Sequence, residues 1–347
     1  MAGFKFAKLA EKFIHALELA GAVVITLRDI EQRPAELSVT VDGTVYHLEV
    51  HLWTITPGGK GRGRPRERRI QKTGVSQFVL RPGVRTIIGG WHEETDVFAF
   101  WDVRRHLQSS KKSPSMQISL DTLEKAAHVG MATEVRHVRE GQEIAIGVHS
   151  DYLLWYIQEY ERIYECGDEV EAASELVEAS PEEEREFIDS GSTDTAQSRR
   201  HKVVSVVQTF RDARFRPLVL RAYGFRCCLT NVALRLVDAA HVVPVSDPTS
   251  TDEPCNGVAL NPLLHRAYDC GLLGLLPNHK TALNKRILEH LRAQKLDDGL
   301  DLIQRLVPAV MRLPASPEFH PPPAYLHRGL RSRGWTEEEI REAVSSS

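Results

Sequence analysis

The stretch 234–269 constrains the fold of this chain most, because its residue pattern changes twice over a short distance. It opens with an apolar run typical of a strand, which brings the carboxylate of Asp238 close to the imidazole of His241. An amide follows at a turn, at Asn256, and residues 261–269 then begin with Asn-Pro, which is typical of a helix start. The order therefore predicts a strand, a loop and a helix, each carrying a polar side chain.

Two side chains of the expected helix share one face. His265 and Asp269 are four residues apart, so both could reach a single metal ion. Each feature also has an ordinary interpretation, because Asp269 could simply form a salt bridge with Arg266 and Asn-Gly is a common turn. The functional interpretation depends on the features occurring together.

This order resembles the ββα-metal fold of the HNH nucleases found in bacterial restriction and defence systems. The subgroup concerned carries the motifs Ala-Ala-His-Val/Ile-x-Pro, Asn-Gly-x-x-Leu and Leu-His-x-x-Tyr/Phe-Asp-x-Gly-Leu. This chain has all of them, at 239–244, 256–260 and 264–272. The resemblance runs from Phe210 to Leu283 and rests on the order and separation of the motifs, since each alone is weak.

The resemblance implies a catalytic role for two residues. His241 would be the general base that activates water for phosphodiester hydrolysis, a task that suits an imidazole because it titrates near neutral pH. Asn256 would orient His241, with its side-chain oxygen holding the other ring nitrogen.

The resemblance also implies a divalent metal. His265 is the first candidate ligand and Asp269 the second. The third ligand is open, because many relatives carry Asp or His where this chain has Ala240. Asp238 lies on the same side of an extended strand as Ala240 and could reach the metal with a modest shift. Such a set would accept Mg²⁺, Mn²⁺, Ni²⁺ or Zn²⁺, and we expect Mg²⁺ or Mn²⁺ during turnover.

Four cysteines near this region raise the alternative of a structural zinc. Cys227 and Cys228 are adjacent, a poor spacing for two ligands of one tetrahedral site, and Cys255 and Cys270 form no Cys-x-x-Cys pair. We therefore expect them to be buried as small apolar groups.

The rest of the chain indicates an α+β protein of two domains. Between residues 165 and 189 there are eleven acidic residues and one basic residue, which favours a solvated linker or a loose helix. We expect a mixed α+β DNA-recognition domain at 1–165, an acidic linker at 166–200, and an HNH ββα-metal nuclease domain with flanking helices and a C-terminal helical extension at 201–347. Helices are expected at 9–22, 120–130 and 152–164, and strands at 23–27, 37–41, 45–50, 86–88 and 96–101.

The clearest charged feature of the N-terminal half is a stretch rich in glycine and arginine. Such a segment could track DNA phosphates or contact base edges, and we favour this interpretation over the alternative of a solvated loop. Its basic residues are Lys60, Arg62, Arg64, Arg66, Arg68, Arg69 and Lys72. A set of aromatic and related residues could line a pocket for a flipped base, and core packing is the favoured alternative. These are Trp53, Trp91, His92, Phe98, Phe100 and Trp101.

A second, weaker resemblance involves residues 89–106 and 113–117, which look like the N-terminal region of bacterial restriction and defence nucleases with HNH modules. It assigns no residue roles. The chain shows no run long and apolar enough for a membrane span and no secretory signal, and its five cysteines are an odd number. We therefore expect a cytoplasmic protein.

These observations predict a metal-dependent DNA endonuclease of restriction or phage-defence type that acts on double-stranded DNA. Since one HNH centre cuts one strand at a time, a homodimer is also expected for double-strand breaks. Two alternatives stay open. One is a DNA-binding regulator with an HNH-like module that no longer cuts, and the other is a mobile-element or RNA-directed nuclease.

Overall fold

The structure of the protein is a computed structural model that describes residues 4–58, 65–107, 115–138 and 141–346. The chain divides into two compact units, 1–213 and 214–347. The division falls within helix α6 (Asp194–Ala222), which contributes residues to both units. Each unit has its own hydrophobic core, and the predicted α+β class is confirmed.

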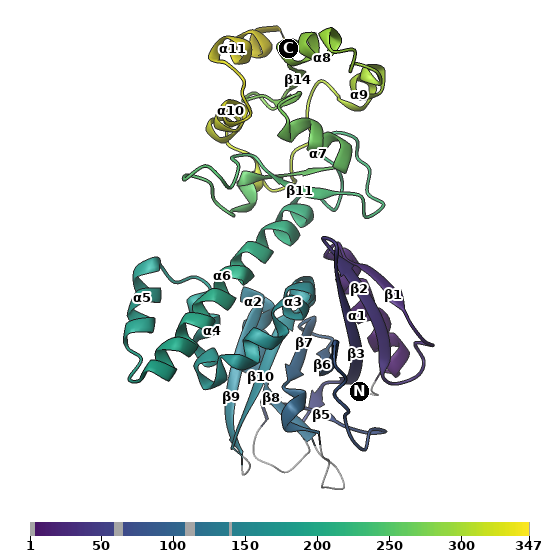
Figure 1. Ribbon diagram of the computed structural model, residues 1–347, viewed down its shortest axis with the longest axis vertical. Coiled ribbons are helices and arrows are strands. Elements are labelled where there is room, and N and C mark those ends of the chain that lie inside the picture. Colours follow the sequence, from purple (N-terminus) through teal and green to yellow (C-terminus); the bar gives the residue numbers. More distant parts are fainter. Residues whose placement is uncertain (1–3, 59–64, 108–114, 139–140, 347) are drawn as a thin grey trace. The chain divides into compact units, whose positions relative to one another are not determined.

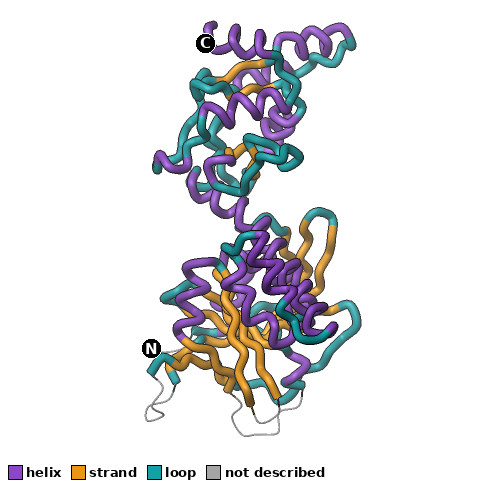
Figure 2. The backbone as a smooth tube through the Cα atoms, turned by 90° about the vertical axis from the view of Figure 1, so that its left-hand side faces the viewer, coloured by secondary structure: helices purple, strands orange, loops and turns teal. Residues whose placement is uncertain are grey.

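The N-terminal unit is built on a seven-stranded sheet in the order β1-β2-β3-β6-β7-β10-β9 (Figures 1 and 2). All its pairs are antiparallel except β3 with β6. The hairpin turn between β2 and β3 has positive φ at both central residues, 48° at Asp42 and 76° at Gly43. The sequence predicts such a turn, because Asp-Gly tolerates this conformation. The strands are β1 (Val23–Thr26), β2 (Ala35–Val41), β3 (Thr44–Thr54), β6 (Val84–His92), β7 (Val97–Trp101), β9 (Met131–Val138) and β10 (Gly141–His149). A smaller three-stranded sheet holds β4 (Thr56–Pro57), β5 (Glu67–Gln71) and β8 (Ser115–Ser119).

Both faces of the large sheet are covered by other elements. Helices α1 (Phe6–Leu19) and α3 (Leu153–Glu165) contribute to the core of one face, where the rings of Phe100 and Tyr156 stack with centroids 4.1 Å apart. Helix α2 (Leu120–Val129) and the small sheet contribute to the other. The aromatic side chains at 53, 91, 98, 100 and 101 are all buried in these cores, so the core interpretation of this set is confirmed.

The segment at 166–200, predicted as a solvated linker or a loose helix, is helical and is not a linker. The segment folds as a 3-10 helix at Gly167–Ala172, α4 (Ala173–Leu176), α5 (Pro181–Asp189) and the start of α6, and its apolar residues join the core of the N-terminal unit. Acidic side chains at 165–184 pair with basic side chains of α6. These ion pairs are Glu165–Lys202, Asp168–Arg199, Glu169–Arg200 and Glu184–Arg211. Because basic residues of α6 neutralise these carboxylates, the acidic composition at 165–189 does not by itself indicate a solvated segment.

The C-terminal unit contains two small hairpins and several helices. Hairpin β11 (Asp238–His241) and β12 (Gly257–Leu260) leads directly into α7 (Pro262–Asp269), and β13 (Leu273–Leu275) pairs with β14 (Thr281–Leu283). The remaining helices are α8 (Lys285–Ala293), α9 (Leu300–Leu306), α10 (Pro323–Ser332) and α11 (Glu337–Ser346). The sequence therefore predicts the strand, loop and helix order of 234–269 correctly.

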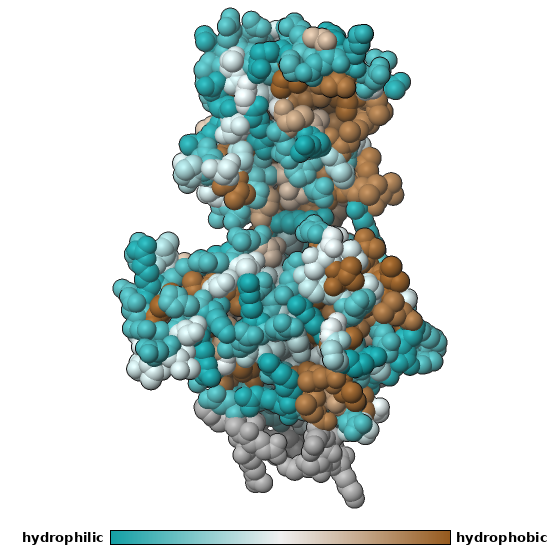
Figure 3. Space-filling view, viewed as in Figure 1, coloured by the Kyte–Doolittle hydropathy of each residue, from teal (hydrophilic) through white to brown (hydrophobic). Residues whose placement is uncertain are grey.

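The surface of the N-terminal unit carries an apolar area over its edge strand. Figure 3 shows hydrophobic residues gathered over β1 and β2, and Val23, Ile25 and Leu27 are each more than half exposed. Apolar surface of this kind on an edge strand is typical of a contact site for another chain.

Candidate active site

The hairpin β11–β12 and helix α7 place the polar side chains of the three motifs in one structural unit. His241 lies opposite Gly257 and Asp238 opposite Leu260 in the antiparallel register. The side chain of Asn261 caps the N-terminus of α7, which fixes the exit of β12 into the helix. A Cβ atom at Gly257 would lie 2.2 Å from a methyl of Val219, so a glycine is required where the hairpin approaches α6.

The imidazole of His241 is held from two directions. Its Nε2 lies 2.9 Å from Oδ1 of Asp252, and its ring stacks on Phe215 with centroids 3.6 Å apart and planes 8° from parallel. With the proton on Nε2 donated to Asp252, Nδ1 is left as the acceptor, and it has no hydrogen-bond partner in the described parts of the chain. The His241 side chain is 19% exposed, so water can reach it.

Asn256 does not hold the ring of His241, and the predicted orienting role is wrong in this structure. Its side chain is fully buried, its Oδ1 accepts a hydrogen bond from Val243 N at 2.8 Å, and its Nδ2 donates to Thr251 O at 2.8 Å. Nδ2 also lies 3.2 Å from Val243 O and from Ser250 Oγ. Asn256 thus closes the loop between β11 and β12, and Asp252 is the partner that this loop presents to His241.

The three predicted metal ligands lie next to one another. Oδ2 of Asp238 is 3.7 Å from Nδ1 of His265, and Oδ2 of Asp269 is 3.4 Å from Nε2 of the same ring. His265 lowers the pKa of Asp238, and Arg216, 3.8 Å from the carboxylate, acts in the same direction. The imidazole of His265 therefore lies between the carboxylates of Asp238 and Asp269.

The chemistry of these donors suits a divalent cation, but their arrangement is not that of a completed site. The two carboxylates contact opposite nitrogens of His265. In the described parts of the chain, no three His, Cys, Asp or Glu side chains converge as a metal-binding group. The nitrogen and oxygen atoms that could bind a cation are thus close together, but they do not point to one common position.

A family model described as HNH endonuclease matches residues 227–275. This segment contains β11, β12, α7 and the residues around His241. Residues 227–275 form an HNH endonuclease domain. The resemblance predicted from the three motifs is confirmed, and the domain supports nuclease activity on DNA.

A second family model, described as Methylase-associated X1, matches residues 46–157. This X1 domain covers most of the large sheet of the N-terminal unit, from β3 to α3. The pair of domains is consistent with an HNH protein of a restriction system. No curated protein matches the chain. In the parts that the structure describes, no helix is long and apolar enough to cross a membrane.

The basic stretch predicted to contact DNA lies within the X1 domain. Lys60, Arg62 and Arg64 fall outside the described residues. Arg66 is paired with Asp121 and Glu124, whose hydrogen bonds raise its pKa.

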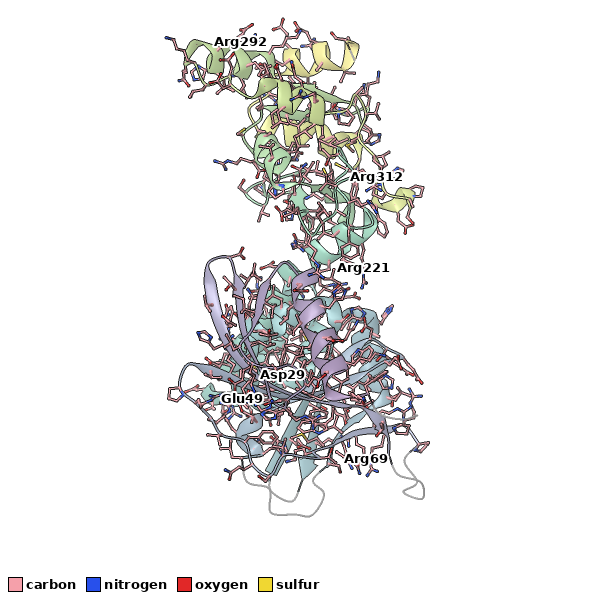
Figure 4. All side chains as sticks on the ribbon, turned by 90° about the vertical axis from the view of Figure 1, so that its right-hand side faces the viewer. Asp29, Glu49, Arg69, Arg221, Arg292 and Arg312 are labelled. Carbon is pink, nitrogen blue, oxygen red and sulfur yellow. The ribbon has the colours of Figure 1, made fainter. Side chains whose placement is uncertain are left out.

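The remaining basic residues of the stretch differ in their surroundings. Arg68 donates to the carbonyl of Pro65 at 3.1 Å, and Arg69, labelled in Figure 4, belongs to β5. Lys72 is only 8% exposed, burial lowers its pKa, and its ammonium lies 5.5 Å from the ring centroid of Phe78. This burial argues against the predicted contact of Lys72 with DNA.

Of the four cysteines of the HNH domain, two are buried as predicted for small apolar groups, and the prediction is wrong for the exposed Cys270. Cys227 and Cys228 are buried, and burial raises the pKa of Cys228 well above its usual range. Cys255 is half-buried and Cys270 exposed. They belong to no metal-binding group in the described ranges.

Proposed function

We propose that this protein is a metal-dependent DNA endonuclease of restriction or phage-defence type, with His241 as its general base. The observation that carries the proposal is the placement of His241 on a ββα hairpin, with its ring fixed by Asp252 and Phe215. A base for phosphodiester hydrolysis needs this combination of a free ring nitrogen, access to water and a fixed orientation.

In the proposed reaction, Nδ1 of His241 accepts a proton from a water molecule. The water oxygen forms a bond to phosphorus while the bond from phosphorus to the 3′ oxygen breaks, and the departing oxygen takes a proton from solvent. The carboxylate of Asp252 keeps Nε2–H in place and stabilises the imidazolium that results.

We further propose that Asp238, His265 and Asp269 hold the divalent cation, which is Mg²⁺ or Mn²⁺, once one carboxylate turns to the ring nitrogen that binds the ion. HNH nucleases generally use such an ion, and this donor set matches its preference for oxygen with one imidazole. When bound, the cation would stabilise the negative charge that develops on the phosphate.

The restriction or defence role rests on the second family match. The X1 model is named for its association with methylases, which fits a system that distinguishes modified from unmodified DNA. We propose that the N-terminal unit recognises the DNA and that the HNH domain cuts it. Digestion of modified and unmodified phage genomes, followed by sequencing of the cut ends, would test this division of labour.

A plasmid-nicking assay with Mg²⁺ or Mn²⁺ tests the nuclease function. The parent protein should nick supercoiled DNA, and His241→Ala should lose this activity while keeping its thermal unfolding profile and DNA affinity. A parent protein that binds DNA without nicking it would favour the regulator alternative. Preference for RNA over duplex DNA in the same assay would favour an RNA-directed nuclease.

Calorimetric titration with Mn²⁺ tests the ligand assignment directly, without activity. His265→Ala, Asp238→Asn and Asp269→Asn should each weaken Mn²⁺ binding, whereas His290→Ala, a change at an exposed position of α8, should not. Unchanged Mn²⁺ affinity in His265→Ala would remove His265 from the ligand set.

A further inference from the structure

Arg333 lies just after α10, outside the segment that matches the HNH family, yet its side chain reaches the centre of the candidate active site. Nη2 donates to the carbonyl of His241 at 2.7 Å, and Nη1 donates to the carbonyl of Val242 at 2.7 Å. Nη2 also lies 3.4 Å from Oδ1 of Asp269. The guanidinium therefore bridges the strand that carries the base and the helix that carries two candidate ligands.

The surroundings of Arg333 fix its guanidinium in this position. The side chain is only 6% exposed, and the guanidinium lies 3.8 Å from the ring centroid of Tyr268 on α7. Burial costs a charged group free energy unless it is paired and hydrogen-bonded, and both conditions are met here. An arginine suits this place better than a lysine because its planar group donates to several acceptors at once.

Helix α10 itself packs closely against the end of β11. A Cβ atom at Gly329 would lie 2.2 Å from the carbonyl oxygen of Val242, so only glycine allows this approach. The preceding residue, Arg328, donates to Oδ2 of Asp247 at 2.8 Å, in the loop that leads to Asp252. Hence α10 and the residue that follows it hold both the strand end at His241 and the loop that supplies its partner.

Most backbone hydrogen bonds at the end of β11 come from β12, and the hydroxyl of Tyr268 also donates to the carbonyl of Val242 at 3.4 Å. The β11–β12 ladder ends at the pair His241–Gly257, and the next backbone bond joins Val242 N to Asn256 O. These backbone bonds all come from the side of β12. Arg333 supplies an opposing contact at both carbonyls, and its charge also faces the carboxylate of Asp269.

We propose that Arg333 is a positioning residue of the nuclease centre, which fixes the backbone of His241 and the carboxylate of Asp269 relative to each other. This inference rests on the proposed function. It extends the functional unit beyond residues 227–275 and gives the C-terminal helices a role in the reaction.

The test compares Arg333→Met and Arg333→Lys with the parent in the full-length chain. Misplacing a catalytic group by about 1 Å can cost about 10²-fold in rate, so Arg333→Met should lower kcat for nicking by about this factor while KM for DNA changes little. Arg333→Lys keeps the charge but not the paired donors, and it should recover only part of the rate. Mn²⁺ should bind Arg333→Met at least as tightly as the parent, because a cation beside Asp269 has been removed.

Arg312→Met is the matched control. Arg312, labelled in Figure 4, also donates to backbone carbonyls of the C-terminal unit, those of Tyr223 and Arg226, which are distant in sequence from His241. If Arg333 serves stability alone, the two methionine variants should lose unfolding temperature and activity in parallel. A parent-like kcat in Arg333→Met, or an equal loss in Arg312→Met at equal unfolding temperature, would overturn the proposal.

Hydrogen exchange measured by mass spectrometry separates this inference from the proposed function. Arg333→Met should speed amide exchange in peptides covering 238–247, and Arg312→Met should not. If the parent protein fails to nick DNA, the proposed function fails, and the exchange result still decides whether Arg333 holds the strand of His241. Unchanged exchange in 238–247 would contradict the inference whatever the parent does.

Discussion

The imidazole of His241 lies flat against the ring of Phe215, with centroids 3.6 Å apart and planes only 8° from parallel. Phe215 belongs to α6 and is buried, so its own ring is fixed by packing. The stack sets the plane of the imidazole, and the bond from Nε2 to Asp252 sets the rotation within that plane. Together they define where Nδ1 points.

Replacement of Phe215 by leucine should therefore impair catalysis beyond its effect on stability. The smaller side chain leaves one face of His241 without support, and we expect kcat for nicking to fall about 10-fold or more, with KM for DNA nearly unchanged. Leu220→Ala is the control, since Leu220 is buried in the same core and its truncation should cost about 2–5 kcal/mol, at least as much as the change at Phe215. Equal loss of kcat in both variants would show that Phe215 acts through stability alone.

Asp252 should be needed for rate rather than for folding. Its carboxylate is 47% exposed and accepts one hydrogen bond from His241, so Asp252→Ala should leave the unfolding temperature nearly unchanged. It should lower kcat by about 10²-fold, because the ring loses its orientation and the imidazolium loses a counter-charge. Glu253→Gln removes the same charge from the neighbouring residue and should nick DNA at the parent rate. An active Asp252→Ala protein would mean that the carboxylate is only a resting-state partner of His241.

Asn256, in contrast, should be needed for folding rather than directly for the rate of cleavage. Its buried amide joins Val243, Ser250 and Thr251, and Asn256→Ala would leave several of these buried groups unpaired at about 1–3 kcal/mol each. We expect a large fall in unfolding temperature of the C-terminal unit, measured by calorimetry, with loss of activity as its consequence. Asn261→Ala, which removes a helix cap, should cost only about 1 kcal/mol. If Asn256→Ala unfolds like the parent but is inactive, the direct orienting role would have to be restored.

The sequence predicts the local part of this site well and the long-range part poorly. Asp238, His265 and Asp269 come from β11 and α7, which lie close in the chain, so periodicity and turn residues suffice to bring these three together. The partners of His241 leave no such signal. Asp252 lies in an irregular loop, Phe215 is one apolar residue of a helix, and nothing in the pattern of the chain points them at an imidazole.

The same limit applies to Arg333 and to the acidic segment. The contact of Arg333 with His241 spans 92 positions of the chain, and its residue type is ordinary for the end of a helix. The acid-rich residues near Glu165 and Glu184 are paired by bases of α6 that lie outside the segment. The composition of the acidic segment alone cannot show that basic residues from another part of the chain neutralise its charge.

The basic stretch of the X1 domain provides a last prediction, on DNA binding. Binding should be measured in a His241→Ala background so that the DNA stays intact. Each phosphate contact contributes about −0.9 to the slope of log K against log salt concentration. The combined change Lys60→Ala, Arg62→Ala and Arg64→Ala should therefore weaken binding and make this slope shallower by up to about 3 units.

Arg66→Ala is the internal control for this prediction, because the guanidinium of Arg66 already faces two carboxylates, Asp121 and Glu124. A paired cation releases few counterions when DNA binds, so the slope in Arg66→Ala should stay close to that of the His241→Ala background. The opposite result, a parent-like slope in the triple variant with a shallower one in Arg66→Ala, would place the DNA contact at Arg66, just before β5. It would then remove the glycine-rich segment from the proposed recognition surface.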